Sequence, residues 1–202
     1  MPIDRQICAE GARHLRRVDP TLAEVIGKIG PCTLRVRRDR FASLTQSILS
    51  QQVSTQAAAT IGRRLATAAG GRICPEALAG LTDEEIRGAG VSPQKLRYIR
   101  DLSDRTADGR LQLSRLGHLS DARVIETLTC VKGIGVWTAQ MFLIFVLGRT
   151  DILPCGDLGV QNAMQQLYGL AERPPPPEME AIAALWHPYA SIGSWYCWRS
   201  LD

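Results

Sequence analysis

Apolar residues recur three or four positions apart along most of this chain. This spacing places apolar side chains on one face of a helix and predicts about ten helices separated by turn residues. Only Thr33–Val36 alternates well enough to suggest a strand, so we expect an all-α fold. The segments with helical spacing are Cys8/Ala12/Leu15, Leu44/Ile48, Ala57/Ile61/Leu65, Leu96/Ile99/Leu102, Val124/Leu128, Ala139/Leu143/Val146 and Met179/Ile182/Leu185.

A run of prolines at Pro174–Pro177 interrupts the pattern before the last helical segments. Proline fixes the backbone and removes an N–H donor, so we expect an extended connector with a helix opening at Glu178. Such a connector joins elements rather than independent domains. We therefore predict one domain over residues 1–202.

Composition limits the class of protein. The chain has 202 residues, of which 45% are hydrophobic, enough to bury a substantial core. Its 24 basic and 20 acidic residues give a net charge of +4, which fits a nucleic-acid partner without requiring one. We find no run of about 20 apolar residues and no signal-peptide core at the N-terminus, and expect a cytoplasmic protein with no membrane partner.

The six cysteines are scattered, and no two stand in a Cys-x-x-Cys pair. Neither a zinc site nor a disulfide framework is indicated, so we expect free thiols. The three histidines are isolated and indicate neither a metal site nor a serine–histidine relay. The basic run Arg35–Arg40 either lines a phosphate path or forms a solvated face.

Two glycines, Gly133 and Gly135, bracket a single apolar residue between two helical segments. We expect them to allow a sharp turn with positive φ and to open a new helix at about Val136. The first N–H groups of a helix lack intrahelical acceptors and can hold a phosphate. The pattern therefore predicts a hairpin, at about 128–139, that grips a nucleic-acid backbone.

Asp157 follows this hairpin by the length of one helix and a short loop, so its carboxylate can return beside the hairpin. Its simplest role is the N-cap of the helix that contains Val160 and Met164. A second role is compatible with the first, because N–H groups at a helix start keep a carboxylate ionised. An ionised carboxylate can stabilise the positive charge that develops on a sugar when an N-glycosidic bond breaks.

Four motifs stand in order along the chain: Ile-Leu-Ser-Gln-Gln-Val-Ser (48–54), Gly-Ile-Gly-Val-Trp-Thr-Ala (133–139), Gly-Asp-Leu-Gly-Val (156–160), and Trp-His-Pro-Tyr with a later Trp-Tyr-Cys-Trp-Arg (186–199). Together they resemble the helix-hairpin-helix (HhH-GPD) DNA glycosylase superfamily, and within it the 3-methyladenine DNA glycosylase II group. The resemblance runs from about Phe41 to Arg199. Two positions depart from it: Lys132 stands where the hairpin usually has proline, and Ala190 where arginine is common.

The resemblance implies two helical lobes flanking an active-site cleft, without the N-terminal β domain of larger members. It implies that Asp157 is catalytic and that Trp137 and Trp198 line the base pocket. Trp137 stands where strand-cleaving members carry a lysine, so no Schiff base is expected. Met141, one turn later, would line the same pocket. The plainer interpretation of Trp137, Trp198 and Met141 is that they belong to the core, as we expect of Trp186 and Trp195.

The resemblance also assigns the DNA contacts. Gln52 would fill the gap left by an extruded base, with Gln51 beside it at the pocket; otherwise both are ordinary loop residues, and Ser54 is an N-cap. Main-chain N–H groups of Gly133, Gly135 and Thr138 would grip the phosphate backbone.

The same resemblance implies at most one metal, a Na⁺ or K⁺ ion. It would be held by the backbone carbonyls of Thr129, Val131 and Ile134 and would add positive field where a phosphate docks. Some superfamily members carry a four-cysteine iron–sulfur cluster near the C-terminus. Here only Cys197 lies in that region, so we expect no cluster.

The implied function is a monofunctional base-excision repair glycosylase without lyase activity. It would flip out and hydrolyse alkylated purines (3-methyladenine, 7-methylguanine) from double-stranded DNA, leaving an abasic site. We expect a monomer in the cytoplasm, associated with the nucleoid if bacterial. Two alternatives remain: a glycosylase for other damaged or mismatched bases, and a noncatalytic helix-hairpin-helix DNA-binding protein.

Overall fold

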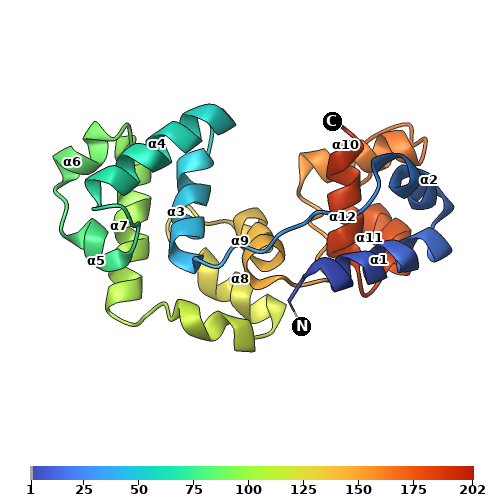
Figure 1. Ribbon diagram of the computed structural model, residues 1–202, viewed down its shortest axis with the longest axis horizontal. Coiled ribbons are helices and arrows are strands. Elements are labelled where there is room, and N and C mark those ends of the chain that lie inside the picture. Colours follow the sequence, from blue (N-terminus) through green and yellow to red (C-terminus); the bar gives the residue numbers. More distant parts are fainter. Residues whose placement is uncertain (1) are drawn as a thin grey trace. The chain divides into compact units, whose positions relative to one another are not determined.

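Helices follow one another along residues 2–202, the part of the chain that the computed structural model describes (Figure 1). No strand occurs among these residues, so the fold is all-α as predicted. Contacts divide the chain into two compact units. One joins the N-terminal segment through Val36 to Leu143–Asp202, and the other is Arg37–Phe142.

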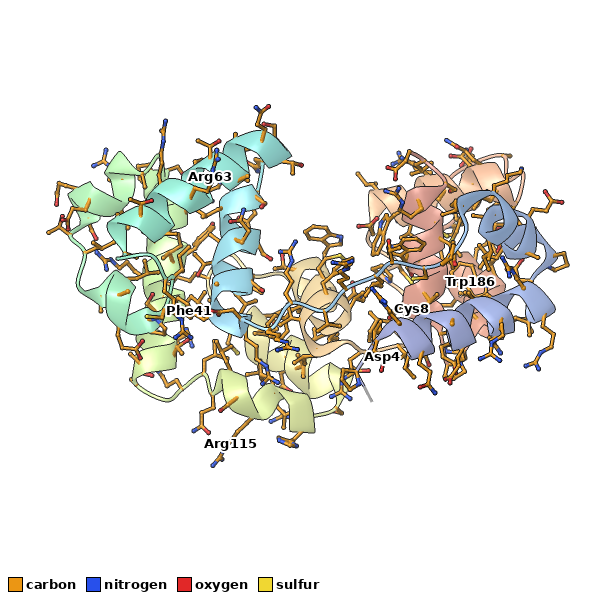
Figure 2. All side chains as sticks on the ribbon, viewed as in Figure 1. Asp4, Cys8, Phe41, Arg63, Arg115 and Trp186 are labelled. Carbon is orange, nitrogen blue, oxygen red and sulfur yellow. The ribbon has the colours of Figure 1, made fainter. Side chains whose placement is uncertain are left out.

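The first unit is built around the C-terminal helix α12, coloured red in Figure 1. Residues 190–197 of α12 are all buried, and the helix contacts α1, α2 and α10. Trp186, labelled in Figure 2, is fully buried, as expected. Its indole N–H donates to Asp19 Oδ2 at 2.8 Å. The elements of this unit are α1 (Arg5–Val18), α2 (Pro20–Ile29), the π-helical turn η2 (Leu143–Leu147), α10 (Leu158–Leu167), α11 (Pro176–Ala183), η3 (Ala184–Trp186) and α12 (Ala190–Arg199).

The second unit packs α3 against α4, α7 and α9. Polar side chains cap several of its helix starts: the side chains of Asp39, Ser54, Ser92 and Ser120 each accept a backbone N–H three residues later. The N-cap role of Ser54 is thereby confirmed. The elements are α3 (Arg40–Ser50), α4 (Thr55–Ala68), α5 (Pro75–Ala79), α6 (Asp83–Gly88), α7 (Pro93–Ala107), η1 (Leu113–His118), α8 (Asp121–Thr129) and α9 (Val136–Phe142).

Two local predictions are wrong. Thr33–Val36 is extended but forms no strand, because no described segment pairs with it; Leu34 is buried on its own. The last helices open at Pro176 rather than Glu178, since proline is compatible with the first turn, where its missing N–H has no helical acceptor.

No helix among the described residues is long and apolar enough to cross a membrane.

Candidate functional site

The hairpin between α8 and α9 lies in the second unit, and α9 begins at Val136 as predicted. Gly133 has φ of +81°, and a Cβ there would lie 2.1 Å from Cδ2 of Tyr98. Only glycine therefore fits this position, for both conformation and space. Gly135 differs from expectation, because its φ is not positive. No described atom lies within 4 Å of a Cβ built at Gly135, which leaves room for another backbone to approach.

Of the three predicted amides, that of Thr138 lies in the first turn of α9, whereas those of Gly133 and Gly135 precede the helix. The first helical hydrogen bond runs from the Ala139 N–H to the Gly135 carbonyl at 3.0 Å, so the amides of residues 136–138 precede it. Thr138 buries its side chain and could meet a phosphate only through its main chain. Trp137 is 48% exposed, which excludes a core role. Met141, one turn later, is half-buried.

Lys132 holds the hairpin through its backbone N–H, a group that proline does not have. Its backbone N–H donates to Asp101 Oδ2 at 2.9 Å, and Arg105 Nε binds the same oxygen at 2.9 Å. Burial alone would raise the pKa of Asp101, but the Lys132 amide and Arg105 hold it below its ordinary value. A hydrogen bond to α7 thus restrains the turn at the position where the ring of the family's proline would fix the backbone angle φ.

The loop after α3 is tied to this hairpin. Gln51 Nε2 donates to the Gly133 carbonyl at 2.7 Å, so the side chain expected at the base pocket joins the two loops. Lys95 Nζ donates to the Leu49 carbonyl at 2.7 Å, and burial lowers the pKa of this amine. Gln52 is exposed with φ of +55°, the one non-glycine residue with positive φ in residues 2–202. Such a conformation is strained in glutamine and marks a functional candidate.

Asp157 lies in the first unit and caps α10. Its Oδ1 accepts the Val160 N–H at 2.9 Å, which confirms the N-cap role. The Trp198 indole Nε1 donates to the same oxygen at 2.8 Å. The Asp157 side chain is 8% exposed. Two N–H donors on one oxygen fix the orientation of a nearly buried carboxylate, which is the arrangement expected of a preorganised charged group.

Trp198 is half-buried and does more than pack. Its ring lies 5.6 Å from that of Phe145, at an interplanar angle of 31°. Gly159 lies against both partners: a Cβ there would be 3.0 Å from Asp157 Oδ1 and 3.0 Å from Trp198 Cδ1. The predicted carboxylate and tryptophan are thus brought together in one unit, with an aromatic neighbour and a close-packed glycine.

Four residues that contact the candidate site residues were not predicted. Phe145 and Gly159 lie against Trp198, and Tyr98 and Asp101 lie against the hairpin. Gly159 stands inside the Gly-Asp-Leu-Gly-Val motif, which was a usable signal. Phe145 lies in the π-helical turn. Apolar spacing of an α-helix does not show which way the side chains of such a turn point. Tyr98 and Asp101 belong to α7, and the sequence gives no indication that they meet the hairpin.

Other candidates have structural partners. Arg40 NH1 donates to the carbonyls of Leu113 and Ser114, so this member of the basic run is not simply solvated. His187 Nδ1 lies 2.7 Å from Asp151 Oδ1, so this histidine has a structural partner. Ala190 is fully buried, so the arginine common in the family would not fit this packing.

The predicted cation ligands are the last residue of α8 and two residues of the turn that follows it. Thr129 is the last residue of that helix, and the Val131 carbonyl accepts the Ile134 N–H at 3.1 Å. A carbonyl oxygen has a second lone pair, so these main-chain oxygens have the chemistry for a monovalent ion. In residues 2–202 no group of three His, Cys, Asp or Glu side chains is placed to hold a metal.

A model of the HhH-GPD superfamily of base excision DNA repair proteins matches residues 45–188. The putative DNA-3-methyladenine glycosylase YfjP of Bacillus subtilis is 36% identical over 169 residues, which cover 80% of this chain. That match spans 59% of the relative's own length. DNA-3-methyladenine glycosylase 1 of Schizosaccharomyces pombe is 28% identical, over 93% of this chain and 85% of the relative.

Solved structures give the same result. A DNA-3-methyladenine glycosidase from Bacillus halodurans superimposes with a TM-score of 0.85 and 36% identity, over 94% of this chain and 88% of that chain. The S. pombe 3-methyladenine DNA glycosylase Mag1, solved with abasic DNA, gives a TM-score of 0.83 and 27% identity, covering 95% and 96%.

Proposed function

We propose, from the premise that this chain belongs to the HhH-GPD superfamily of base excision DNA repair proteins, that it is a monofunctional glycosylase for alkylated purines. It would extrude a damaged base from double-stranded DNA, hydrolyse the N-glycosidic bond and leave an abasic site. The observation that carries the proposal is the Asp157 carboxylate, held by two N–H donors and nearly buried.

The chemistry follows from that carboxylate. Breaking an N-glycosidic bond builds positive charge on the sugar, and a fixed anion with little solvent around it stabilises this charge more than water does. The same carboxylate can orient the attacking water. Because Val160 and Trp198 already hold Oδ1, the group needs little reorganisation when a sugar arrives.

Substrate preference rests on the indoles. The face of a tryptophan attracts a cation by about 0.5 to 2 kcal/mol, depending on desolvation. Purines alkylated at N3 or N7 carry positive charge, whereas oxidised bases and uracil do not. Trp198, which is half-buried and hydrogen-bonded to Asp157, is therefore proposed to contact the flipped base. A contact from Trp137 is proposed on the family resemblance alone. The relatives named as 3-methyladenine glycosylases support this substrate class.

DNA binding is assigned to the hairpin. The amides at the start of α9 would meet a phosphate, helped by a monovalent cation on the carbonyls of Thr129, Val131 and Ile134. The strained Gln52 would occupy the gap that the flipped base leaves. Such backbone contacts imply binding that weakens steeply with salt.

Release of free bases from DNA treated with a methylating agent, separated by chromatography, tests the proposal. We expect 3-methyladenine and 7-methylguanine in the soluble fraction and intact strands with abasic sites. Because position 137 is tryptophan and not lysine, borohydride should trap no covalent adduct. A trapped adduct, or strong preference for 8-oxoguanine or uracil, would overturn the proposal; DNA binding without base release would indicate a noncatalytic module.

A further inference from the structure

A cavity of about 560 Å³ lies in the first unit between α1 and the segment that follows α2. Four arginines and two cysteines line it: Arg5, Arg13, Arg16, Arg35, Cys8 and Cys32. No acidic side chain of residues 2–202 is among the lining residues. A cavity with one sign of charge concentrates ligands of the opposite sign.

This cavity is separate from the carboxylate cluster. Tyr196 of α12 also lines it and donates its hydroxyl to the Gly30 carbonyl at 3.0 Å. Trp198, two residues later, binds Asp157. Residues two apart on a helix point to nearly opposite sides, so the cavity and Asp157 lie on different sides of α12. The proposed glycosylase chemistry does not use the cavity.

The two cysteines both line this cavity, and their thiols interact with each other. Cys8, labelled on α1 in Figure 2, is 3% exposed, and its Sγ lies 3.8 Å from the Leu34 carbonyl oxygen. Cys32 is half-buried in a segment without regular structure. A hydrogen bond between the two thiols lowers the pKa of Cys8, against the opposing effects of burial and of Asp4. The same bond raises the pKa of Cys32.

Two thiols in one cavity can take the two roles of a disulfide-exchange reaction, the attacking thiol and the thiol that resolves the mixed disulfide. In disulfide exchange a thiolate attacks first and forms a mixed disulfide, and a second thiol close to the first can then displace the remaining product. The helix fixes Cys8, whereas Cys32 belongs to an irregular segment whose backbone is not held in a helix. Both thiols are free in this structure.

We propose that Cys8 and Cys32 form a reversible dithiol–disulfide pair that reacts with small anionic disulfides entering the arginine-lined cavity. First, the Cys8 thiolate attacks one sulfur of the incoming disulfide, forming a mixed disulfide and releasing one thiolate. Second, Cys32 loses its proton to solvent and attacks the Cys8 sulfur, forming the Cys8–Cys32 bond and releasing the second thiolate. The protein loses two electrons and two protons, and the small disulfide is reduced to two thiols.

The arginines predict selectivity by charge. Oxidised glutathione carries a net negative charge and cystamine a net positive charge, yet both are small disulfides. We expect oxidised glutathione to react with Cys8 at least about tenfold faster than cystamine at low salt, after each rate is divided by its rate with free cysteine. The ratio should fall toward one as salt screens the arginines.

The experiment uses the whole, reduced protein without oxygen. Oxidised glutathione is added, remaining thiols are alkylated, and peptides are mapped by mass spectrometry over time. The native protein should lose two hydrogens, link Cys8 to Cys32 and release two equivalents of glutathione. Cys32→Ser should stop at a mixed disulfide on Cys8. Cys155→Ser, which changes a partly buried cysteine elsewhere in the unit, should react as the native protein does.

Two results would overturn the proposal, and both are read on the native protein, so they do not depend on any variant folding. One is that exposed Cys130 is modified while Cys8 and Cys32 stay reduced. The other is equal normalised rates with oxidised glutathione and cystamine at low salt.

Discussion

Replacing Gly159 with alanine should separate stability from activity. A Cβ at this position would lie 3.0 Å from Asp157 Oδ1, 3.0 Å from Trp198 Cδ1 and 3.3 Å from its Nε1. Ordinary contact needs about 3.5 Å or more between such atoms, so the indole and the carboxylate must each move by a few tenths of an ångström. The 2.8 Å hydrogen bond between them is therefore lengthened or bent.

The two effects of Gly159→Ala have different magnitudes. Alanine favours a helix by about 0.5 to 1 kcal/mol over glycine, and this gain opposes a crowding cost of about 1 kcal/mol or more. The free energy of unfolding should therefore change little. Excision should fall about tenfold to a hundredfold, because small displacements of a positioned catalytic group have effects of that size.

The assay is single-turnover release of methylated bases, with thermal unfolding of the same samples. Gly27→Ala is the matched control, because Gly27 lies within α2 and a Cβ added there would have no described atom within 4 Å. That variant should gain stability and keep native excision. A Gly159→Ala protein that excises at the native rate would refute the claim that the Asp157–Trp198 geometry matters.

Three further predictions concern the second unit. Lys132→Pro should lower the free energy of unfolding by about 1 kcal/mol because the N–H to Asp101 is lost, whereas Lys132→Ala, which keeps that N–H, should not; equal thermal unfolding of the two variants would contradict this. Because the pKa of Asp101 is lower in the folded protein, its carboxylate stabilises the fold at pH values above the ordinary aspartate pKa. This stabilisation is lost as the pH falls through the pKa that Asp101 has in the folded protein. The stability difference between native protein and Asp101→Asn should therefore be present at neutral pH and shrink as the pH falls below the ordinary aspartate pKa of about 3.9 in denaturant titrations. Gln52→Gly should unfold no more easily, since glycine accepts φ of +55°, but should excise more slowly; unchanged excision would mean that Gln52 is an ordinary loop residue.

The all-α fold and the main helix starts could be predicted because they depend on local signals. Apolar spacing, the Asp157 cap and the opening of α9 at Val136 each need only neighbouring residues. The isolated extended segment at 33–36 could not be told from a strand, because a strand is defined by a partner elsewhere in the chain.

Single site residues could be predicted where they stand inside a sequence motif, but the contacts between them could not. Asp157 and Trp198 were named from the sequence, but their hydrogen bond joins positions far apart in the chain. The same holds for Lys132 with Asp101 and for Gln51 with Gly133. A one-dimensional pattern shows that a proline is missing at Lys132, and only the fold shows which carboxylate replaces its effect.

The central claim is that the Asp157 carboxylate carries the chemistry, and Asp157→Asn tests it most directly. Asparagine is also a good N-cap, so the Val160 N–H keeps an oxygen acceptor and the fold should be retained. The account predicts a folded variant that still binds DNA containing methylated bases and releases none of them at a measurable rate. Release within about tenfold of the native rate, a change of only about 1.4 kcal/mol in the barrier, would show that Asp157 is a helix cap and not the catalytic residue.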